Sequence, residues 1–228
     1  MRRLLPEPAD DTAVADAYAF SLGRRADRPW VGLCMVASID GSTVVGGNSA
    51  GLSSPTDTAV LWQLRAIADV IVVGAGTVRD EGYGPPRKHG QRIGVVTRSG
   101  DVDMSNELFT SGSGFLITTD DATFDTAEID VVRAGTGTVD LAIAIGRLGR
   151  LIAHCRVVQA EGGAILNGAL LDADMIDEIN LTTSPATVGG TGPRLAAGAG
   201  NHQHRFDLAQ LAIDDRSFMY ARWLRRRG

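Results

Sequence analysis

A pair of adjacent glycines preceded by an acid is the part of this sequence best suited to chemistry. Glu161, Gly162 and Gly163 follow an apolar run, Cys155–Val158, that is typical of a buried strand, and they precede a helical pattern. Without a Cβ atom, the backbone can approach a pyrophosphate closely, and the free N–H groups at the start of a helix point toward the anion. The turn is therefore suited to binding a dinucleotide.

A second strand-to-glycine turn lies earlier in the chain, where the apolar run Val70–Val73 leads into Gly74, Ala75, Gly76 and Thr77. Two such units in one small domain favour a two-lobed cofactor cleft. Each unit by itself is equally compatible with an ordinary turn at the carboxyl end of a strand. Neither unit matches the G-x-G-x-x-G fingerprint, because an arginine stands where the third glycine of the earlier unit would fall.

The elements that would position these turns alternate between apolar strands and amphipathic helices. The run Val31–Ala37 predicts a buried strand, and Ser54 followed by Pro55 supplies the N-cap and first residue of a helix that continues to about Ala68. Further strands are predicted at 70–73, 93–97, 114–118 and 156–160, with a short edge-like one at 131–132, and further helices at 140–148 and 164–173.

The C-terminal part of the chain has a different pattern. Residues 178–183 alternate in polarity, and residues 206–209 and 217–223 have the pattern of antiparallel strands that close a sheet. We therefore predict an α/β fold with a mixed, mostly parallel sheet, helices on both faces and an antiparallel C-terminal edge. Residues 1–28, with a helical patch at 12–20, are expected to be an N-terminal extension packed on a single domain that spans 29–228.

Composition and charge narrow the classes of function. With 44% hydrophobic residues, 21% charged residues and a formal net charge of −5, the chain has the composition of a soluble globular protein and not of a nucleic-acid-binding one. The arginines at 222 and 225–227 are expected to form a solvated C-terminus.

No apolar run approaches the roughly 20 residues that span a bilayer, and no signal peptide is recognisable. Cys34 and Cys155 are interpreted as buried thiols, and the four histidines show no metal-binding pattern, so we expect a cytoplasmic protein without a metal.

Four motifs stand in order along the chain: Ala37–Gly41, Leu64–Arg65 before a strand, Val73–Arg79, and Glu161–Gly163 followed by Asp177–Ile179. Their order and spacing resemble the reductase domain of the bifunctional riboflavin-biosynthesis deaminase–reductase over about residues 30–224. The H-x-E and P-C-x-x-C pattern of the zinc deaminase half is absent from the sequence, so the resemblance is closest to stand-alone pyrimidine-reductase-like proteins. The resemblance implies a dihydrofolate-reductase-like fold.

The resemblance also implies an activity. Its family comprises NADPH-dependent oxidoreductases that convert the ribosylamino group of 5-amino-6-(5-phosphoribosylamino)uracil, or of its diaminopyrimidine counterpart, to the ribityl form. A hydride passes to the sugar C1′ while the protein holds the nicotinamide against that carbon, binds the phosphate and assists a proton transfer. The domains of this family tend to dimerise, and the strand-rich C-terminus is a candidate interface for a homodimer.

Site residues follow from the resemblance position by position. The cofactor would contact the two glycine turns and the end of the first strand: Val36, Ala37, Gly74, Gly76, Thr77, Gly162, Gly163, Ala164, Ile165 and Leu166. Thr97, Arg98 and Ser99, just past a predicted strand, would meet the adenosine 2′-phosphate. The phosphorylated pyrimidine substrate would contact Ser49, Arg65, Glu81, Glu161 and, by position only, Arg87, and the candidate catalytic residues are Glu161 and Asp40.

Several of these residues have a second interpretation that the sequence leaves open. Asp40 before a glycine is often a turn former that bonds its own backbone, and Arg65 near a helix end is often a complement to the helix dipole. Glu161 has the stronger functional position, because ligands of open α/β sheets bind at the carboxyl ends of strands. Ser42 replaces a lysine and Gly51 a tryptophan that are common in the family, and both changes fall on the substrate side.

Two other functions are weighed against the pyrimidine reductase. One is a dihydrofolate or other pterin reductase, since fold alone does not separate the two. Folate reductases use an acid on the helix after the first strand, and that helix here offers only Asp57, in its first turn. The other is a nucleotide-binding module without turnover, which would not require Glu161 or Arg65.

Overall fold

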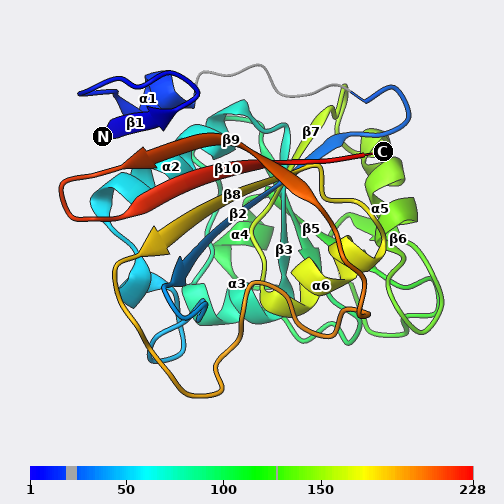
Figure 1. The fold of residues 1–228 in the computed structure, drawn as a ribbon. Helices are drawn as coiled ribbons and strands as arrows, with labels where there is room; N and C mark the ends of the chain where they lie inside the picture. The colour runs from blue at the N-terminus through cyan, green and yellow to red at the C-terminus, as the bar shows by residue number, and fades with distance from the viewer. Residues whose placement is uncertain (19–24, 127, 228) are drawn as a thin grey trace.

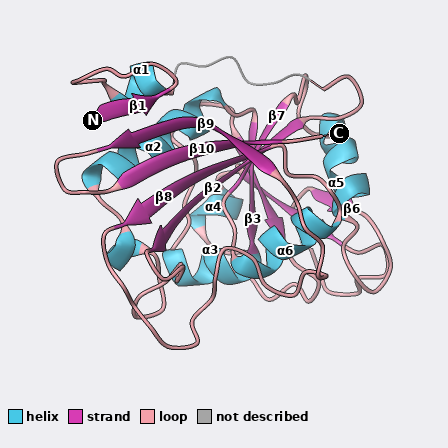
Figure 2. Cartoon of the chain, viewed as in Figure 1, coloured by secondary structure: helices cyan, strands magenta, loops and turns pink. Residues whose placement is uncertain are grey.

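The computed structural model describes residues 1–18, 25–126 and 128–227, which form one sheet of ten strands with helices on both sides (Figures 1 and 2). The strands are β1 (Arg2–Leu5), β2 (Trp30–Ser38), β3 (Val70–Gly74), β4 (Arg92–Val96), β5 (Gly114–Thr118), β6 (Val131–Arg133), β7 (Val157–Ala160), β8 (Glu178–Ser184), β9 (Phe206–Ile213) and β10 (Met219–Arg225). The helices are α1 (Val14–Ala17), α2 (Pro55–Ile67), α3 (Ala75–Glu81), α4 (Glu107–Thr110), α5 (Leu141–Arg147) and α6 (Ala164–Asp172), with short 3-10 turns η1 (Ala50–Leu52) and η2 (Leu148–Arg150).

The strand order confirms the predicted fold class. Across the sheet the order is β1-β9-β10-β8-β2-β7-β3-β4-β5-β6. The seven strands from β8 to β6 are parallel to one another, whereas the pairs β8–β10, β10–β9 and β9–β1 are antiparallel. The sheet is therefore mostly parallel, with an antiparallel edge built largely from the C-terminal strands.

Strand β3 shows how the sequence separates the two faces of the sheet. Because side chains alternate along a strand, Val70 and Val72 pack with α5 and α6 on one face, while Ile71 and Val73 pack with α3 and α4 on the other. The second face continues under α2, which packs toward β9 and β10. Helices thus cover both faces of the parallel part, as predicted, and this requires the near-continuous apolar strands seen in the sequence.

Helix α2 begins as its sequence indicates. The Ser54 hydroxyl accepts a hydrogen bond from the Asp57 backbone N–H at 3.1 Å, and Pro55 occupies the first helical position. A side-chain oxygen at this place satisfies one of the backbone N–H groups that have no partner within the helix. The helix start is consequently fixed, and with it the position of Asp57 in the first turn.

The N-terminal segment contributes more than an extension packed on the surface. Strand β1 pairs with β9 in antiparallel register, so the first residues of the chain form an edge strand of the main sheet (Figure 1). Helix α1 covers only Val14–Ala17, and the part of the predicted helical patch beyond Tyr18 lies outside the described residues. Backbone pairing of this kind leaves little signal in side-chain periodicity, which explains why the strand was not predicted.

The prediction of a solvated cationic C-terminus is wrong for Arg222 and Arg225, which are mostly covered, whereas Arg226 and Arg227 are exposed. Arg222 pairs with the buried Glu178 at 3.0 Å, and Arg227 pairs with the buried Asp177 at 3.0 Å. Arg225 and Arg226 also form ion pairs with aspartates. These arginines lie on or just after β10, beside acids of the neighbouring strands and loops, so their charges are balanced locally.

Three predictions concerned membranes, cysteines and metals. Within the described residues, no helix is long and apolar enough to cross a bilayer, and no cluster of histidine, cysteine, aspartate and glutamate could hold a metal ion. Cys34 and Cys155 are free thiols that are only partly exposed, and burial raises the pKa of both, that of Cys155 to about 12.

Candidate active site

A cavity of about 1100 Å³ lies along the carboxyl ends of the parallel strands, between α2, α3 and the start of α6. Ligands of open α/β sheets bind in this position. Most of the predicted site residues line it: Val36, Ser49, Arg65, Gly74, Gly76, Thr77, Glu81, Thr97, Arg98, Ser99, Glu161, Gly163, Ala164, Ile165 and Leu166. The predicted residues outside its lining are Ala37, Asp40, Arg87 and Gly162.

The two glycine turns meet in the structure. The Gly74 N–H donates a hydrogen bond to the Gly162 carbonyl at 2.7 Å, which joins the end of β3 to the turn after β7. Gly162 has a φ of +79°, a conformation that favours glycine, and a Cβ on Gly163 would lie 2.9 Å from the Thr77 hydroxyl. Gly162 is therefore favoured by the turn itself, whereas Gly163 is favoured by its close approach to Thr77 at the floor of the cavity.

The start of α6 faces this opening. Gly163 is the N-cap and supplies no side-chain acceptor, so the first backbone N–H groups of the helix have no side-chain cap. Ile165 in the first turn is 71% exposed, although it is a large apolar residue. The uncapped N–H groups of α6, next to Gly163, are suited to bind a pyrophosphate. The exposed Ile165 side chain is suited to contact an adjoining ring or ribose.

The end of β4 forms another part of the cavity. Arg98 and Ser99 line it, but the Thr97 hydroxyl accepts a hydrogen bond from the Gly100 N–H at 3.0 Å and thereby shapes the turn. Arg79 of α3 and Asp101 also line the cavity and form an ion pair at 3.2 Å. Asp101, the acid nearest in sequence to this strand end, is thus already paired with an arginine, and Arg98 adds a cation to the lining of the cavity.

Glu161 lies at the centre of a buried polar network. Arg65 donates to both carboxylate oxygens, from Nε at 2.7 Å and from Nη2 at 2.6 Å, in a bidentate pair. The Tyr83 hydroxyl donates to Oε2 at 2.7 Å and the Gln159 amide to Oε1 at 3.1 Å. The Glu161 side chain is only 3% exposed. Four donors therefore fix the position and orientation of the carboxylate.

This network changes the expected role of Glu161. All four hydrogen bonds that the carboxylate accepts come from side chains of the protein, and two of them come from Arg65. Burial has the largest single effect on the pKa of Arg65 and lowers it, but the hydrogen bonds that Arg65 donates to Glu161, together with the nearby charge of Glu161 and the contact with Tyr83, outweigh burial and raise the pKa of the guanidinium. Burial likewise raises the pKa of Tyr83, which keeps its proton for Glu161. The geometry supports Glu161 as a positioning residue for Arg65.

Two aromatic rings complete the surroundings of Arg65. Its guanidinium carbon lies 4.8 Å from the centre of the Trp62 ring and 5.3 Å from that of Tyr83. Arg87 stacks on the same Trp62 ring at 3.8 Å and lines a smaller side cavity of about 260 Å³ with Trp62 and Arg65. Arg65 lies in the last turn of α2, where a cation complements the helix dipole, and its contacts with Glu161, Trp62 and Tyr83 go beyond that role. Because this side cavity shares Trp62 and Arg65 with the main cavity, Arg87 lies next to the main cavity and could contact an anion bound there.

Ser49 and Glu81, two predicted substrate contacts, bind each other. The Ser49 backbone N–H donates to the Glu81 carboxylate at 2.7 Å. The contact joins the loop before η1 to the end of α3 and closes one side of the cavity, whose lining includes both residues.

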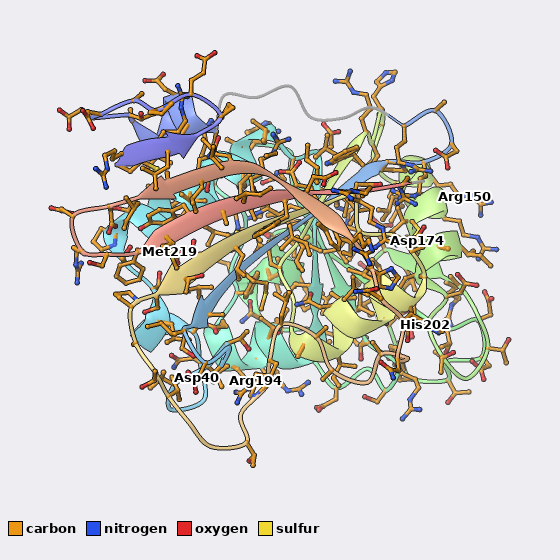
Figure 3. All side chains as sticks on the ribbon, in the orientation of Figure 1. Asp40, Arg150, Asp174, Arg194, His202 and Met219 are labelled. Atoms are coloured by element: carbon orange, nitrogen blue, oxygen red, sulfur yellow. The ribbon has the colours of Figure 1, made fainter. Side chains whose placement is uncertain are left out.

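Asp40 has a structural task outside the cavity. It follows β2 in an exposed turn (Figure 3) and accepts hydrogen bonds from the Ser38 hydroxyl at 2.6 Å and from the backbone N–H groups of Val188 and Gly189 at 3.0 and 2.8 Å. These bonds lower the pKa of Asp40 well below its usual range. The turn-former interpretation fits this geometry, and we assign Asp40 to anchoring the loop after β8 instead of catalysis.

Replacement of Asp40 by alanine is expected to release that loop while leaving cofactor affinity within about twofold. Hydrogen exchange at Val188 and Gly189 should become faster in Asp40→Ala than in the wild type. Because the folded-state pKa is lowered, the anchoring is present above the ordinary aspartate pKa and is lost as the pH falls through the lower folded value. A large fall in kcat with unchanged exchange at the two amides would instead return Asp40 to the catalytic residues.

Sequence reasoning missed several cavity residues. Tyr83, which lines the cavity, was not predicted. Neither was Gln159, which lies outside the lining but on β7, two residues before Glu161, and therefore points to the same face as Glu161. Trp62 lies three residues before Arg65 on α2, a spacing that brings side chains together, so it was accessible to pattern analysis. Asp57 was considered only for the folate alternative, and it also lines the cavity. The Arg79–Asp101 pair joins a helix to a loop and had no sequence signal.

An open, mostly parallel sheet with a ligand-sized cavity at its strand ends defines an α/β domain built to bind a nucleotide-like ligand. Residues 29–219 match the family described as the RibD C-terminal domain. The chain therefore belongs to this family, and the resemblance inferred from the four motifs is confirmed. The match covers most of the chain and includes both glycine turns.

Individual relatives agree with this membership. The chain is 27% identical over 183 residues to a 2,5-diamino-6-ribosylamino-4(3H)-pyrimidinone 5′-phosphate reductase of Methanothermobacter thermautotrophicus, covering 73% of this chain and 82% of the relative. A pyrimidine reductase-like protein of Corynebacterium diphtheriae superposes with a TM-score of 0.77 at 25% identity, covering 89% of this chain and 94% of that one. RibD of Acinetobacter baumannii shares the fold with a TM-score of 0.72 at 18% identity, and the match covers 89% of this chain and 59% of the longer protein.

Proposed function

We propose that the protein is an NADPH-dependent reductase of a ribosylaminopyrimidine phosphate, an intermediate of riboflavin biosynthesis. The observation that carries the proposal is the single cavity that joins the two glycine turns to the Arg65–Glu161 pair. One end has the features of a dinucleotide site, and the other has fixed polar groups beside Arg87. A reductase of its family needs a nicotinamide cofactor, and the named relative acts on a phosphorylated diaminopyrimidinone.

The residues present fit a nicotinamide dinucleotide. Gly163 leaves open the floor that a Cβ would close, the uncapped start of α6 offers N–H groups to the pyrophosphate, and Arg98 with Ser99 would meet the adenosine 2′-phosphate. Val36, at the end of β2, would contact the nicotinamide side. When bound, the cofactor supplies a hydride; the protein's own contribution is to hold both partners in one orientation.

The opposite end of the cavity would hold the substrate. Arg65 and Glu161 together carry no net charge, so Arg87 supplies the net positive charge for the phosphate. Glu161 and Tyr83 fix the guanidinium of Arg65, and two aromatic rings limit its movement. A site held in this way loses little freedom when the substrate binds, which favours a productive orientation of the sugar C1′.

NADPH oxidation followed at 340 nm tests the proposal. The purified protein is assayed with the phosphoribosylaminopyrimidine in its uracil and diaminopyrimidine forms and, in parallel, with dihydrofolate. Turnover of either nucleotide well above that of dihydrofolate supports the proposed reaction. Absence of turnover with both nucleotides, in a protein that binds NADPH, would contradict it.

A dihydrofolate or pterin reductase is the second candidate. It is favoured by one observation, the acid Asp57 in the first turn of α2, which lines the same cavity. Folate reductases carry their acid on the corresponding helix. The network around Arg65 and the adjacent Arg87 favours the phosphorylated pyrimidine, because a pterin has no phosphate for these groups to bind.

Arg87→Ala should weaken binding of the phosphorylated substrate by about 10- to 100-fold, because a hydrogen bond to a charged group contributes roughly 1.5–3 kcal/mol. The dephosphorylated nucleoside should bind both proteins about equally. Arg87 is preferable to Arg65 for this test, since it is exposed and its loss breaks no buried ion pair. Titration of both compounds into both proteins measures the effect, and equal losses for the two compounds would assign Arg87 a packing role on Trp62.

We also propose that the protein acts in the cytoplasm as a homodimer. The face of β8–β10 away from α2 carries partly exposed apolar side chains, among them Met219, which is 41% exposed and lies at the start of β10 (Figure 3). Exposed apolar surface at an antiparallel edge is typical of a protein interface. Sedimentation equilibrium of the purified protein tests the dimer, and a monomer at micromolar concentration would exclude it.

A further inference from the structure

Asp57 is a cavity-lining acid to which the proposed reduction gives no task. Its side chain lies in the first turn of α2 and is partly buried. The Ser53 hydroxyl donates to Oδ2 at 2.6 Å, and the Thr182 side chain also forms a hydrogen bond with the carboxyl group. The acid is therefore held in a defined position from two sides, by Ser53 just before α2 and by Thr182 on strand β8.

The surroundings of Asp57 lack a balancing cation. Burial raises its pKa, and only the two hydroxyl contacts oppose this rise; among the described residues no lysine, arginine or histidine forms an ion pair with it. Removing a carboxylate from water without a cation or several donors is costly. Because a carboxylate only accepts hydrogen bonds, the missing partners are N–H or O–H donors, and the open side of the group is the cavity.

We propose that Asp57 recognises the 2-amino-4-oxopyrimidine edge of the substrate. In such a ring, a nitrogen N–H and the neighbouring 2-amino group point in the same direction and can donate side by side to the two carboxylate oxygens. A uracil presents a C2 carbonyl oxygen at this place, which would face the carboxylate oxygens without a proton between them. The inference rests on the proposed function and selects the diaminopyrimidine form of the substrate over the uracil form.

The spacing along α2 fits this placement. Asp57, Leu61 and Arg65 follow one another at four-residue intervals and all line the cavity. Eight residues of α-helix rise about 12 Å, so the acid and the guanidinium are separated by a distance comparable to the length of an extended phosphoribosylaminopyrimidine. With the base at Asp57, the sugar would lie along Leu61 and the phosphate near Arg65 and Arg87.

The same edge occurs in dihydropterins, so the ligand chemistry has two possible sources. Both a diaminopyrimidinone nucleotide and dihydrofolate would pair with Asp57 through their 2-amino group and adjacent ring N–H. Both ligands would therefore make the same contact with Asp57, whereas only the nucleotide carries a phosphate for the groups at the other end of α2. Binding and turnover together therefore separate the two sources.

Two free bases that differ only at position 2 provide the test. 2,5,6-Triaminopyrimidin-4-one and 5,6-diaminouracil are titrated into the protein saturated with NADP⁺, and the wild type should bind the 2-amino base about 10- to 100-fold more tightly. Asp57→Asn, whose amide can donate to a carbonyl, should lose or reverse this preference. Asp80→Asn makes the same chemical change at another acid lining the cavity and should keep the wild-type ratio.

The outcomes are decided by the ratio of the two affinities. Equal binding of the two bases by the wild type, or an unchanged ratio in Asp57→Asn, overturns the inference. Thermal unfolding of each variant checks that it is folded, and Ser53→Ala provides a milder change that leaves the acid in place but removes one donor. A ratio reduced in Ser53→Ala, although less than in Asp57→Asn, supports the assignment even where the asparagine variant is unstable.

Measuring turnover of the two nucleotides distinguishes failure of this inference from failure of the proposed function. Reduction of both nucleotides at equal kcat/KM, unaffected by Asp57→Asn, would leave the proposed reaction standing and refute the role of Asp57. Absence of reduction of either nucleotide, with base preference still dependent on Asp57, would refute the reaction and support the recognition. A third outcome is that the protein reduces dihydrofolate and not the diaminopyrimidinone nucleotide. If Asp57→Asn then loses both the preference for the 2-amino base and the reduction of dihydrofolate, the ligand recognised by Asp57 is a pterin.

Discussion

Glu161→Leu is expected to destabilise the protein and to abolish most of its activity together. The substitution removes one partner of a bidentate ion pair in which the side chains of Glu161 and Arg65 are 3% and 13% exposed. Loss of one partner from a buried pair costs about 3–5 kcal/mol of unfolding free energy, because the remaining charge is left without compensation. Arg65 would also lose its fixed orientation, and a displacement of about 1 Å at a reacting site can lower the rate by about 100-fold.

The double variant Arg65→Leu/Glu161→Leu is the informative control. Replacing both charges by apolar side chains removes the uncompensated cation, so most of the lost stability should return. Activity should not return, since the two polar side chains proposed to contact the substrate are gone. Urea unfolding of the three variants, with kcat measured at saturating NADPH, gives both quantities. If Glu161→Leu lost activity without any loss of unfolding free energy, a direct role of the carboxylate in proton transfer would be the better explanation.

The fold was largely predictable because the sheet is buried on both faces. Strands such as Val70–Gly74 and Gly114–Thr118 are continuous apolar runs that end in small or polar residues, and the intervening helices have clear starts at Ser54 and Asp140. These signals are local in sequence and follow directly from burial. The edge strand β1 lacks them, since its position depends on backbone pairing with a strand more than 200 residues away.

The candidate site was predictable at the level of strand ends and less so at the level of contacts. The residue types around Glu161 and Gly163 indicated which end of the sheet binds a ligand, because parallel strands bring all their carboxyl ends together. The partners of Glu161 were not predictable: Arg65 lies 96 residues away and Tyr83 lies 78 residues away. The partners of Asp40 had no sequence signal either, since Val188 and Gly189 lie 148 and 149 residues away.

Arg98→Ala is expected to weaken NADPH binding by about 10- to 100-fold and to leave NADH binding almost unchanged. NADPH differs from NADH by a dianionic 2′-phosphate, and an NADP site characteristically offers an arginine and hydroxyl donors at a strand end. Arg98 and Ser99 follow β4 and line the cavity, and the neighbouring Asp101 is paired with Arg79, so its charge does not oppose the phosphate. Hydrogen bonds to a charged group contribute roughly 1.5–3 kcal/mol, which corresponds to the expected range.

Dissociation constants of both cofactors, measured by fluorescence titration for the wild type and for Arg98→Ala, decide the assignment. Arg150→Ala is a matched control, because it removes an exposed arginine of η2 that does not line the cavity (Figure 3). Both cofactors should bind this control as they bind the wild type. The difference between the two cofactors in Arg98→Ala should also shrink as salt is added, since the contact is between an exposed cation and an anion. A parallel loss for NADPH and NADH would mean that Arg98 supports the turn after β4 and does not read the 2′-phosphate.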